Sequence, residues 1–364
     1  MFAWKRLISW LSRSAPQEPP CLPVFWTLQS VYLARAYFVV AELGIADLLY
    51  ERPRTAAELA QTTGVHEPSL YRILRALAGF DVFAENEQGQ FALTERGHSL
   101  REDVLGTVRH WTLLTGSLPA WTSLGQALDV VRTGRSGFQL THGEAGDLYR
   151  FCEHDTAFGR TFIRAMNNWT DWQREAILAR YDFRPFPSVV DVGGGRGSLI
   201  CGILGQSPQT RGMLYDRPQS IEQARAVITA AGLGERCDLV PGNFLESIPA
   251  GGDVYVLKHI LRDWDDELSA TILRNCYHAM SASSRLLIID AVLDPRNSKD
   301  RIGKLLDLEQ MFWLNGTLRT LDQWQALLTK TGFRISELRR TQVVDAVILQ
   351  LEKKSASCGG SSPE

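Results

Sequence analysis

The sequence predicts an α/β protein in which a doubly wound, Rossmann-like domain follows a helical domain that contains a winged helix. Three observations lead to this prediction. Short apolar runs alternate with helical patterns through residues 185–354, which is typical of a parallel sheet covered by helices. A glycine-rich turn, Gly193–Gly197, follows the first of these runs. Residues 55–93 have the order helix, turn, helix and hairpin, which indicates a winged helix.

The chain begins with an arm, residues 1–22, in which apolar and basic residues interleave ahead of a proline-rich run. We expect this arm to be flexible or to form a short amphipathic helix. The winged-helix domain is expected over residues 23–105 and opens with a strongly apolar helical segment, Val24–Tyr50. This segment has more apolar surface than a small winged helix can cover, so a homodimer is expected.

Local signals define the winged helix. Thr55 and Glu58 have the spacing of a capping box, and Pro68 suits the first turn of the next helix. The runs Val82–Ala84 and Phe91–Leu93 flank a polar tip, as the two strands of a hairpin do.

Residues 106–184 have a helical pattern and are expected to form a linker that lines the substrate site. The Rossmann-like domain is expected over residues 185–354, and the Ser- and Gly-rich tail, residues 355–364, is expected to be disordered. The expected strands of the sheet are Val189–Val192, Met213–Asp216, Val254–Leu257, Leu286–Ile289 and Ala346–Leu351.

Composition excludes several classes of function. The net charge of −2 gives no general attraction to nucleic acid or to an anionic membrane. The second helix of the winged helix has only Arg72 and Arg75 as basic residues, too few for phosphate binding, so a packing or dimerisation role is expected. No run reaches the roughly 18 apolar residues of a membrane span, and membrane association is not expected.

The six cysteines lie far apart without a CxxC pair, which predicts reduced thiols and a cytoplasmic location. The seven histidines have no ligand-type spacing, so no metal site is expected.

The glycine-rich turn predicts a cofactor site. Its GxGxG spacing departs from the GxGxxG of dinucleotide sites. Asp191, two residues ahead of Gly193, would lie poorly beside a pyrophosphate and suits a ligand with an ammonium group and no phosphate. Asp216 ends the next expected strand, 23 residues after Gly193, where a carboxylate can bind both ribose hydroxyls.

From Val24 to Glu352 the chain resembles the plant-type O-methyltransferases, the family of the caffeate and hydroxyindole methyltransferases, and within it the bacterial natural-product enzymes. The resemblance is carried by the winged-helix front and by Val189–Gly197, Asp216, Gly242–Phe244 and Lys258–Glu267. It implies a class I methyltransferase domain that binds S-adenosyl-L-methionine, and a homodimer built by the front domain. It also implies methylation of a hydroxyl on a small, phenolic or polyketide-like aromatic metabolite.

The same resemblance assigns cofactor-binding residues. The glycine turn would line the methionine part, Asp216 the ribose, and Asn243 and Phe244 the adenine, where the family often has Asp and Met. His259 is expected to stack near the adenine. The full set of expected cofactor-binding residues is Asp191, Gly193, Gly195, Asp216, Asn243, Phe244, Lys258, Met166 and Thr170.

The family pattern breaks at the catalytic base. The family has a histidine directly before Asp-Trp, and this chain has Arg262. A guanidinium stays protonated and has no acceptor, so Arg262 cannot abstract a proton. Of the two acidic residues that orient the family's histidine, the first corresponds to Asp290 and the second is replaced by Leu318.

Two explanations remain open. In the first, positioning drives methyl transfer, Arg262 favours a phenolate, Asp263 reaches the substrate, and the proton leaves to water or to Asp290, His142 or His154. In the second, the fold binds S-adenosylmethionine but performs hydroxylation or pericyclic chemistry without transfer. We favour the first and take Arg262, Asp263 and Asp290 as the catalytic candidates. The acceptor atom, oxygen, nitrogen or carbon, is left open by the sequence.

Overall fold

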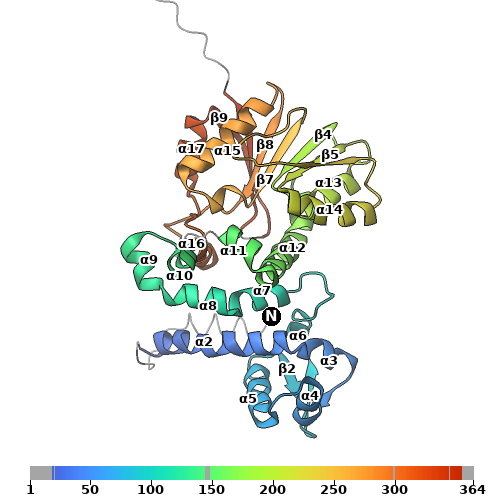
Figure 1. Ribbon diagram of the computed structural model, residues 1–364, viewed down its shortest axis with the longest axis vertical. Coiled ribbons are helices and arrows are strands. Elements are labelled where there is room, and N and C mark those ends of the chain that lie inside the picture. Colours follow the sequence, from blue (N-terminus) through green and yellow to red (C-terminus); the bar gives the residue numbers. More distant parts are fainter. Residues whose placement is uncertain (1–18, 20, 144–147, 298–299, 344, 355–364) are drawn as a thin grey trace, which may run out of the picture. The chain divides into compact units, whose positions relative to one another are not determined.

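The computed structural model describes residue 19 and residues 21–143, 148–297, 300–343 and 345–354, which fall into two compact units (Figure 1). One unit comprises Met1–Trp121 and His154–Trp169, and the other comprises Thr122–Glu153 and Thr170–Glu364. The long helix α12, Thr156–Leu178, contributes to both. Most of the expected arm and the expected disordered tail lie outside the described residues.

The first unit contains the winged helix that the sequence predicts. Helices α4 and α5 are followed by the hairpin β2–β3, and β1 completes a three-stranded antiparallel sheet in the order β1-β3-β2. The elements of this unit before α12 are α2 Cys21–Glu42, α3 Ile45–Glu51, β1 Arg54–Thr55, α4 Ala56–Thr63, α5 Glu67–Ala78, β2 Phe83–Glu85, β3 Gln90–Leu93, α6 Glu95–His98 and α7 Arg109–Gly116.

The local signals are confirmed. Thr55 and Glu58 form the reciprocal capping box of α4, and Pro68 lies in the first turn of α5. The apolar segment Val24–Tyr50 is not one helix, because Gly44 has a left-handed φ of 63° and separates α2 from α3.

Helix α2 is strongly apolar on the outside. Its exposed large apolar residues are Val24, Phe25, Trp26, Leu28, Val31 and Tyr32. By length and composition alone α2 could cross a membrane, since Arg35 and Glu42 are its only charged residues. Thr27, Gln29, Ser30 and Arg35 interrupt its apolar residues, so it contains no run of about 18 apolar residues, and a core helix or a signal sequence has the same length and composition.

The linker region is helical, as expected. Its elements besides α7 and α12 are α8 Leu118–Gly125, α9 Ala127–Thr133, α10 Gly137–His142 and α11 Leu148–His154. Residues 144–147, between α10 and α11, lie outside the described part.

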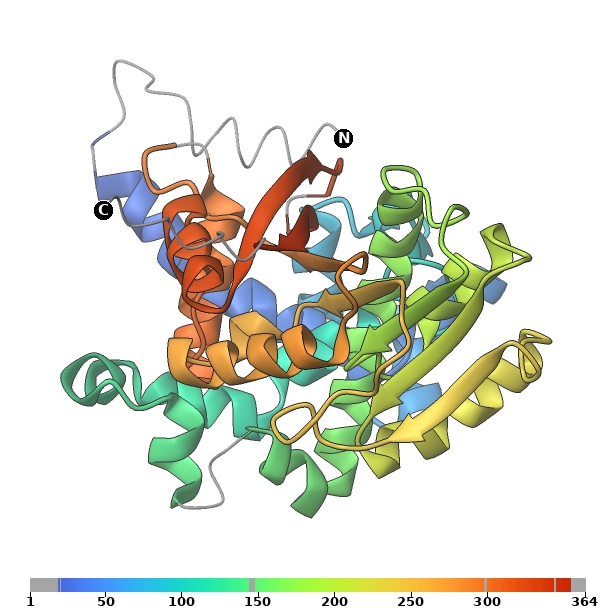
Figure 2. The same ribbon diagram turned by 90° about the horizontal axis from the view of Figure 1, so that it is seen from above.

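The second unit is built on a seven-stranded sheet in the order β6-β5-β4-β7-β8-β10-β9, which runs in Figure 2 from yellow β6 at one edge to red β9 at the other. The first five strands are parallel, whereas β10 is antiparallel to both β8 and β9. The strands are β4 Ser188–Val192, β5 Arg211–Asp216, β6 Cys237–Pro241, β7 Val254–Lys258, β8 Arg285–Asp290, β9 Phe333–Arg340 and β10 Val347–Lys353.

The predicted parallel sheet is confirmed for the five strands from β6 to β8 in the sheet order, but the prediction did not foresee that β10 is antiparallel, and it missed β6 and β9. Both missed strands lie at the edges of the sheet, where charged and polar residues replace the continuous apolar runs of buried strands.

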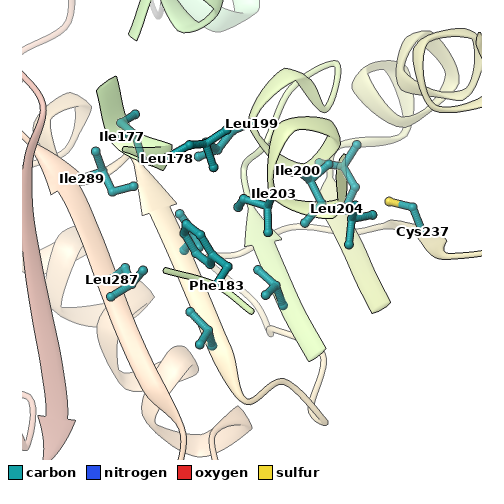
Figure 3. Packing of buried hydrophobic residues seen from close by; sticks show 14 of the residues in the cluster. Ile177, Leu178, Phe183, Leu199, Ile200, Ile203, Leu204, Cys237, Leu287 and Ile289 are labelled. Carbon is teal, nitrogen blue, oxygen red and sulfur yellow. The ribbon is translucent and has the colours of Figure 1, made fainter. Parts of the chain in front are cut away.

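Helices cover both faces of this sheet. Successive residues of a strand point to opposite sides, so the continuous apolar runs of the buried strands place apolar side chains on both faces. Leu199, Ile200, Ile203 and Leu204 of α13 pack with Leu287 and Ile289 of β8 in the core of one face (Figure 3). The other face packs against α15 and α17 through residues such as Tyr255, Leu273 and Trp324. The helices of this unit after α12 are α13 Ser198–Gln206, α14 Pro218–Ala230, α15 Asp266–Ala279, α16 Arg301–Trp313 and α17 Leu321–Lys330.

The parallel strands bring the predicted site residues to one edge. The last residues of β5, β7 and β8 are Asp216, Lys258 and Asp290, and the glycine turn follows β4 directly. Carboxyl ends of parallel strands lie at the same edge of a sheet, which is where ligands bind in folds of this class.

Candidate active site

The glycine turn combines close packing with open space. Gly193, Gly195 and Gly197 all have positive φ, which glycine adopts without strain. A Cβ on Gly193 would lie 2.4 Å from Ile260, whereas a Cβ on Gly195 would meet nothing within 4 Å. The turn is therefore held against the protein on one side and leaves room for a ligand on the other.

Asp216 is joined directly to this turn. Its Oδ2 accepts a hydrogen bond from the Gly195 backbone N–H at 2.8 Å, and its Oδ1 accepts from the Arg217 N–H at 2.6 Å. Arg217 in turn pairs with Glu153 of α11 at 2.9 Å. The end of β5 is thus connected to both the glycine turn and the linker helix α11.

Asp191 is a buried carboxyl with an unsatisfied oxygen. It is 1% exposed, and its Oδ2 has no hydrogen-bond partner within the described chain. Burial raises the pKa of Asp191 to about 7, which Lys258 opposes and Asp216 reinforces. An ammonium group next to this oxygen would satisfy it and favour the ionised carboxyl. The site therefore fits the ammonium of S-adenosylmethionine.

Lys258 lies next to this carboxyl and to α12. Its Nζ is 3.2 Å from the Thr170 hydroxyl and 3.3 Å from His259 Nδ1. Burial lowers the pKa of Lys258 to about 8. His259 has a left-handed φ of 55°, its Nε2 is 3.0 Å from the Asp345 carbonyl, and burial holds the pKa of its imidazole well below the usual value.

Arg262, at the position where the resemblance implies a histidine base, lies in a buried ion-pair cluster. Its Nε donates to Asp290 Oδ1 at 2.6 Å, and its Nη1 is 3.7 Å from Asp345 Oδ2. Burial alone would lower the pKa of this guanidinium, but the carboxylates of Asp290 and Asp345 outweigh burial and raise it. Arg262 stays charged, and two carboxylates compensate that charge.

Asp345 is a site residue that the sequence interpretation missed. It is 1% exposed, precedes β10, and also accepts a hydrogen bond from Gln173 of α12 at 2.5 Å. The only sequence signal was an acidic residue directly before the apolar run that begins at Ala346. Asp345 is the second carboxylate beside Arg262, next to Asp290. The resemblance implies a second acidic residue at position 318, where this chain has Leu318.

Asp263 follows Arg262 in a short 3-10 turn, Leu261–Asp263, and accepts a hydrogen bond from the Tyr149 hydroxyl of α11. Burial raises the pKa of Asp263 to about 7, although Tyr149 and Arg262 oppose this rise. The Tyr149 ring is stacked near Trp264 with centroids 6.4 Å apart, and Phe244 meets Trp264 edge-on at 6.0 Å. Phe244 therefore lies beside the residue that follows the turn Leu261–Asp263.

The remaining candidates are placed differently. Asn243 is exposed, and its amide binds locally to Glu246 and to the Leu245 N–H. Met166 lies one helical turn before Thr170 on α12, in the part that belongs to the first unit. His142 is half-buried with its ring 4.3 Å from that of Phe151. His154 is exposed at the end of α11.

No cluster of three or more His, Cys, Asp or Glu side chains suited to a metal ion occurs among the residues whose placement is described.

This fold and this site define a methyltransferase of the Rossmann-like class, and the comparisons with known proteins agree. The chain belongs to the O-methyltransferase family: residues 121–334 match the O-methyltransferase domain and residues 26–103 match the O-methyltransferase dimerisation domain. As a member of this family it is an S-adenosylmethionine-dependent methyltransferase.

Several bacterial natural-product enzymes are similar over most of their length. The phenazine O-methyltransferase PhzM of Lysobacter antibioticus is 37% identical over 87% of this chain and 90% of its own. The mitomycin biosynthesis 6-O-methyltransferase of Streptomyces lavendulae is 37% identical over 85% and 87%. An N,N-dimethyltransferase of 8-amino-8-demethylriboflavin from Streptomyces davaonensis is 34% identical over 87% and 91%. The crystal structure of LaPhzM superposes with a TM-score of 0.87 at 33% identity, covering 92% of this chain and all of the other.

The Asp191 carboxyl predicts that cofactor binding depends on pH. Because its pKa is about 7, Asp191 is mostly protonated at pH 6, and binding of the cofactor ammonium must expel that proton. The affinity for S-adenosylmethionine should rise about fivefold from pH 6 to pH 7, where the cofactor's own α-amino group stays charged. Titration calorimetry in two buffers of different ionisation enthalpy measures both the affinity and the released proton.

The control is Asp191→Asn, which should bind more weakly at both pH values and release no proton. A wild-type affinity that is flat between pH 6 and pH 7, without proton release, would contradict the assignment of Asp191 to the ammonium.

Proposed function

We propose that this protein methylates a hydroxyl group of a small aromatic metabolite, with S-adenosylmethionine as the methyl donor. The observation that carries the proposal is the placement of two sets of residues on adjacent strands. The glycine turn, Asp191 and Asp216 suit the cofactor, and Lys258 leads directly into the turn that carries Arg262 and Asp263. The related phenazine and mitomycin O-methyltransferases support an aromatic or quinone-like natural product as substrate.

When bound, S-adenosylmethionine would supply a methyl carbon that an oxygen nucleophile attacks in line, with the sulfonium sulfur as the leaving group. The protein's task is therefore to hold the donor and the hydroxyl in that geometry, which can lower the barrier by about 7–11 kcal/mol. Asp216 binds the ribose, Asp191 the ammonium, and Phe244 and Asn243 flank the adenine. Gly193 and Gly195 let the methionine part approach the backbone. Lys258, Thr170 and Met166 complete the cofactor side.

Arg262 fixes the turn Leu261–Asp263, which we call the catalytic turn, and does not act as a base. Its guanidinium is held between Asp290 and Asp345, and its backbone carbonyl accepts a hydrogen bond from the Thr317 N–H at 2.9 Å. A cation that two carboxylates already compensate stabilises a phenolate less than a free cation would. Asp290 binds Arg262 through Oδ1 and is 1% exposed, so a substrate hydroxyl does not reach it and we look for the proton acceptor elsewhere.

The test is incubation with methyl-labelled S-adenosylmethionine and a panel of phenols, hydroxyquinones and arylamines, followed by mass spectrometry. We expect label on a product oxygen and one S-adenosylhomocysteine per product. Asp216→Ala should weaken cofactor binding more than tenfold, because it removes charge-assisted hydrogen bonds to the ribose. Label on nitrogen would make the protein an N-methyltransferase, and a changed substrate with intact cofactor would favour the non-methylating alternative.

We also propose that the protein is a homodimer assembled through α2. Four of the six exposed apolar residues of this helix, Trp26, Leu28, Val31 and Tyr32, lie in the stretch that matches the dimerisation domain, residues 26–103, and the other two directly precede it. Burying such a surface on a second copy is favourable by roughly 25 cal/mol per Å². Sedimentation at micromolar concentration should give twice the chain mass of 40.7 kDa.

The variant Trp26→Glu/Val31→Glu should shift this dimer to monomer, because two charges would be buried in the interface. The matched control is Leu268→Glu, which changes a similarly exposed apolar residue on α15 and should stay dimeric. A monomeric wild type would contradict the dimer.

A further inference from the structure

We propose that Glu309 is a catalytic residue whose carboxylate accepts the proton that the substrate hydroxyl loses during methyl transfer. The proposal rests on the proposed function and deepens it, since no histidine occupies the family's base position. Glu309 lies on α16, a helix that none of the sequence motifs includes.

The segment after α16 is hydrogen-bonded to the catalytic turn, Leu261–Asp263. The Thr317 N–H donates to the Arg262 carbonyl at 2.9 Å, and a Cβ on Gly316 would lie only 2.1 Å from that same oxygen. Gln310, which follows Glu309, has its Oε1 2.9 Å from the same Cβ position. The last turns of α16 therefore lie against the turn that carries Arg262 and Asp263.

The charges of Arg262, Asp263 and Asp345 act on the Glu309 carboxyl. Burial raises the pKa of its carboxyl to about 7; Arg262 lowers it, and Asp263 and Asp345 raise it. A carboxylate with a pKa near the working pH is both largely ionised and basic enough to take a proton.

Glu309 is the carboxylate of this cluster that is partly accessible. Asp290 and Asp345 are each 1% exposed and pair with Arg262, although Asp290 Oδ2 has no hydrogen-bond partner within the described residues, and Asp263 accepts the Tyr149 hydroxyl. Glu309 is half-buried, and its side chain makes no hydrogen bond or ion pair within the described part of the chain.

The face of α16 that carries Glu309 is exposed over its first turns. Ile302 and Leu305 precede Glu309 by seven and four residues, which places all three on one helical face. They are 53% and 64% exposed. An aromatic substrate could therefore lie along this face with its hydroxyl at the carboxylate.

In the proposed step, the bond between the sulfonium sulfur and the methyl carbon breaks as the bond between the substrate oxygen and that carbon forms. The sulfur keeps the electron pair and becomes a neutral thioether. The hydroxyl proton passes to a Glu309 oxygen and from there to water, which restores the carboxylate.

The test is Glu309→Gln, assayed on a series of substituted phenols that the wild type methylates. For a phenol with a pKa near 10, kcat should fall about 10²-fold to 10⁴-fold, the range for loss of a general base. For phenols that are already ionised at the assay pH the loss should be below about fivefold, because no proton has to move. The fall of wild-type kcat below about pH 7 should be absent in the variant, and cofactor affinity should be unchanged.

The matched control is Glu267→Gln, an exposed carboxylate in the first turn of α15, which should keep wild-type kinetics. An equal loss on all phenols would show that Glu309 is only structural. The low-pH fall could instead disappear in Asp263→Asn or His142→Phe while Glu309→Gln retains it, which would assign the proton to that residue and overturn the proposal. A wild type that methylates no hydroxyl would contradict the proposed function itself, whereas transfer that Glu309→Gln leaves unchanged would contradict only this role.

Discussion

The interaction on which the site depends is the buried ion-pair cluster of Arg262 with Asp290 and Asp345. It joins three segments that are distant in sequence: the turn after β7, the end of β8 and the approach to β10. Removal of one partner of a buried pair leaves an uncompensated charge, which typically costs about 3–5 kcal/mol. Gln173 binds the same Asp345 and extends the cluster to α12. One electrostatic unit therefore joins the turn Leu261–Asp263 to the helix that carries Thr170.

The arrangement differs from a site built on one histidine, which is the base that the resemblance to the plant-type O-methyltransferases implies. A neutral histidine can accept a hydrogen bond from the hydroxyl and then take its proton. A guanidinium has no acceptor atom, so it can do neither. Arg262 supplies a fixed positive charge that lets several carboxylates share a small buried volume. Burial in turn raises the pKa of Asp263 and Glu309 to about 7. The loss of the imidazole is thus compatible with proton transfer, provided that a carboxylate of raised pKa faces the substrate.

Sequence patterns predicted the parts of the fold that are encoded locally. The buried strands β4, β5, β7 and β8 are continuous apolar runs, and the glycines with Asp216 define the cofactor edge because they follow such strands. The edge strands β6 and β9 have no such run. Asp345 and Glu309 could not be predicted, because an acidic residue outside any motif gains its role only from the tertiary contacts that bring it to Arg262.

The central claim is that Arg262 is bound internally by Asp345 and Asp290. The most direct measurement is a double-mutant cycle with Arg262→Met and Asp345→Asn, with the free energy of unfolding taken from urea titrations. Arg262→Met should destabilise the protein by about 3–5 kcal/mol, and Asp345→Asn by less, because Asp290 still pairs with Arg262. The double variant should be less destabilised than the sum by at least about 1 kcal/mol, since no charge at position 345 then loses its partner. Strictly additive effects, or an Arg262→Met variant as stable as the wild type, would contradict the claim.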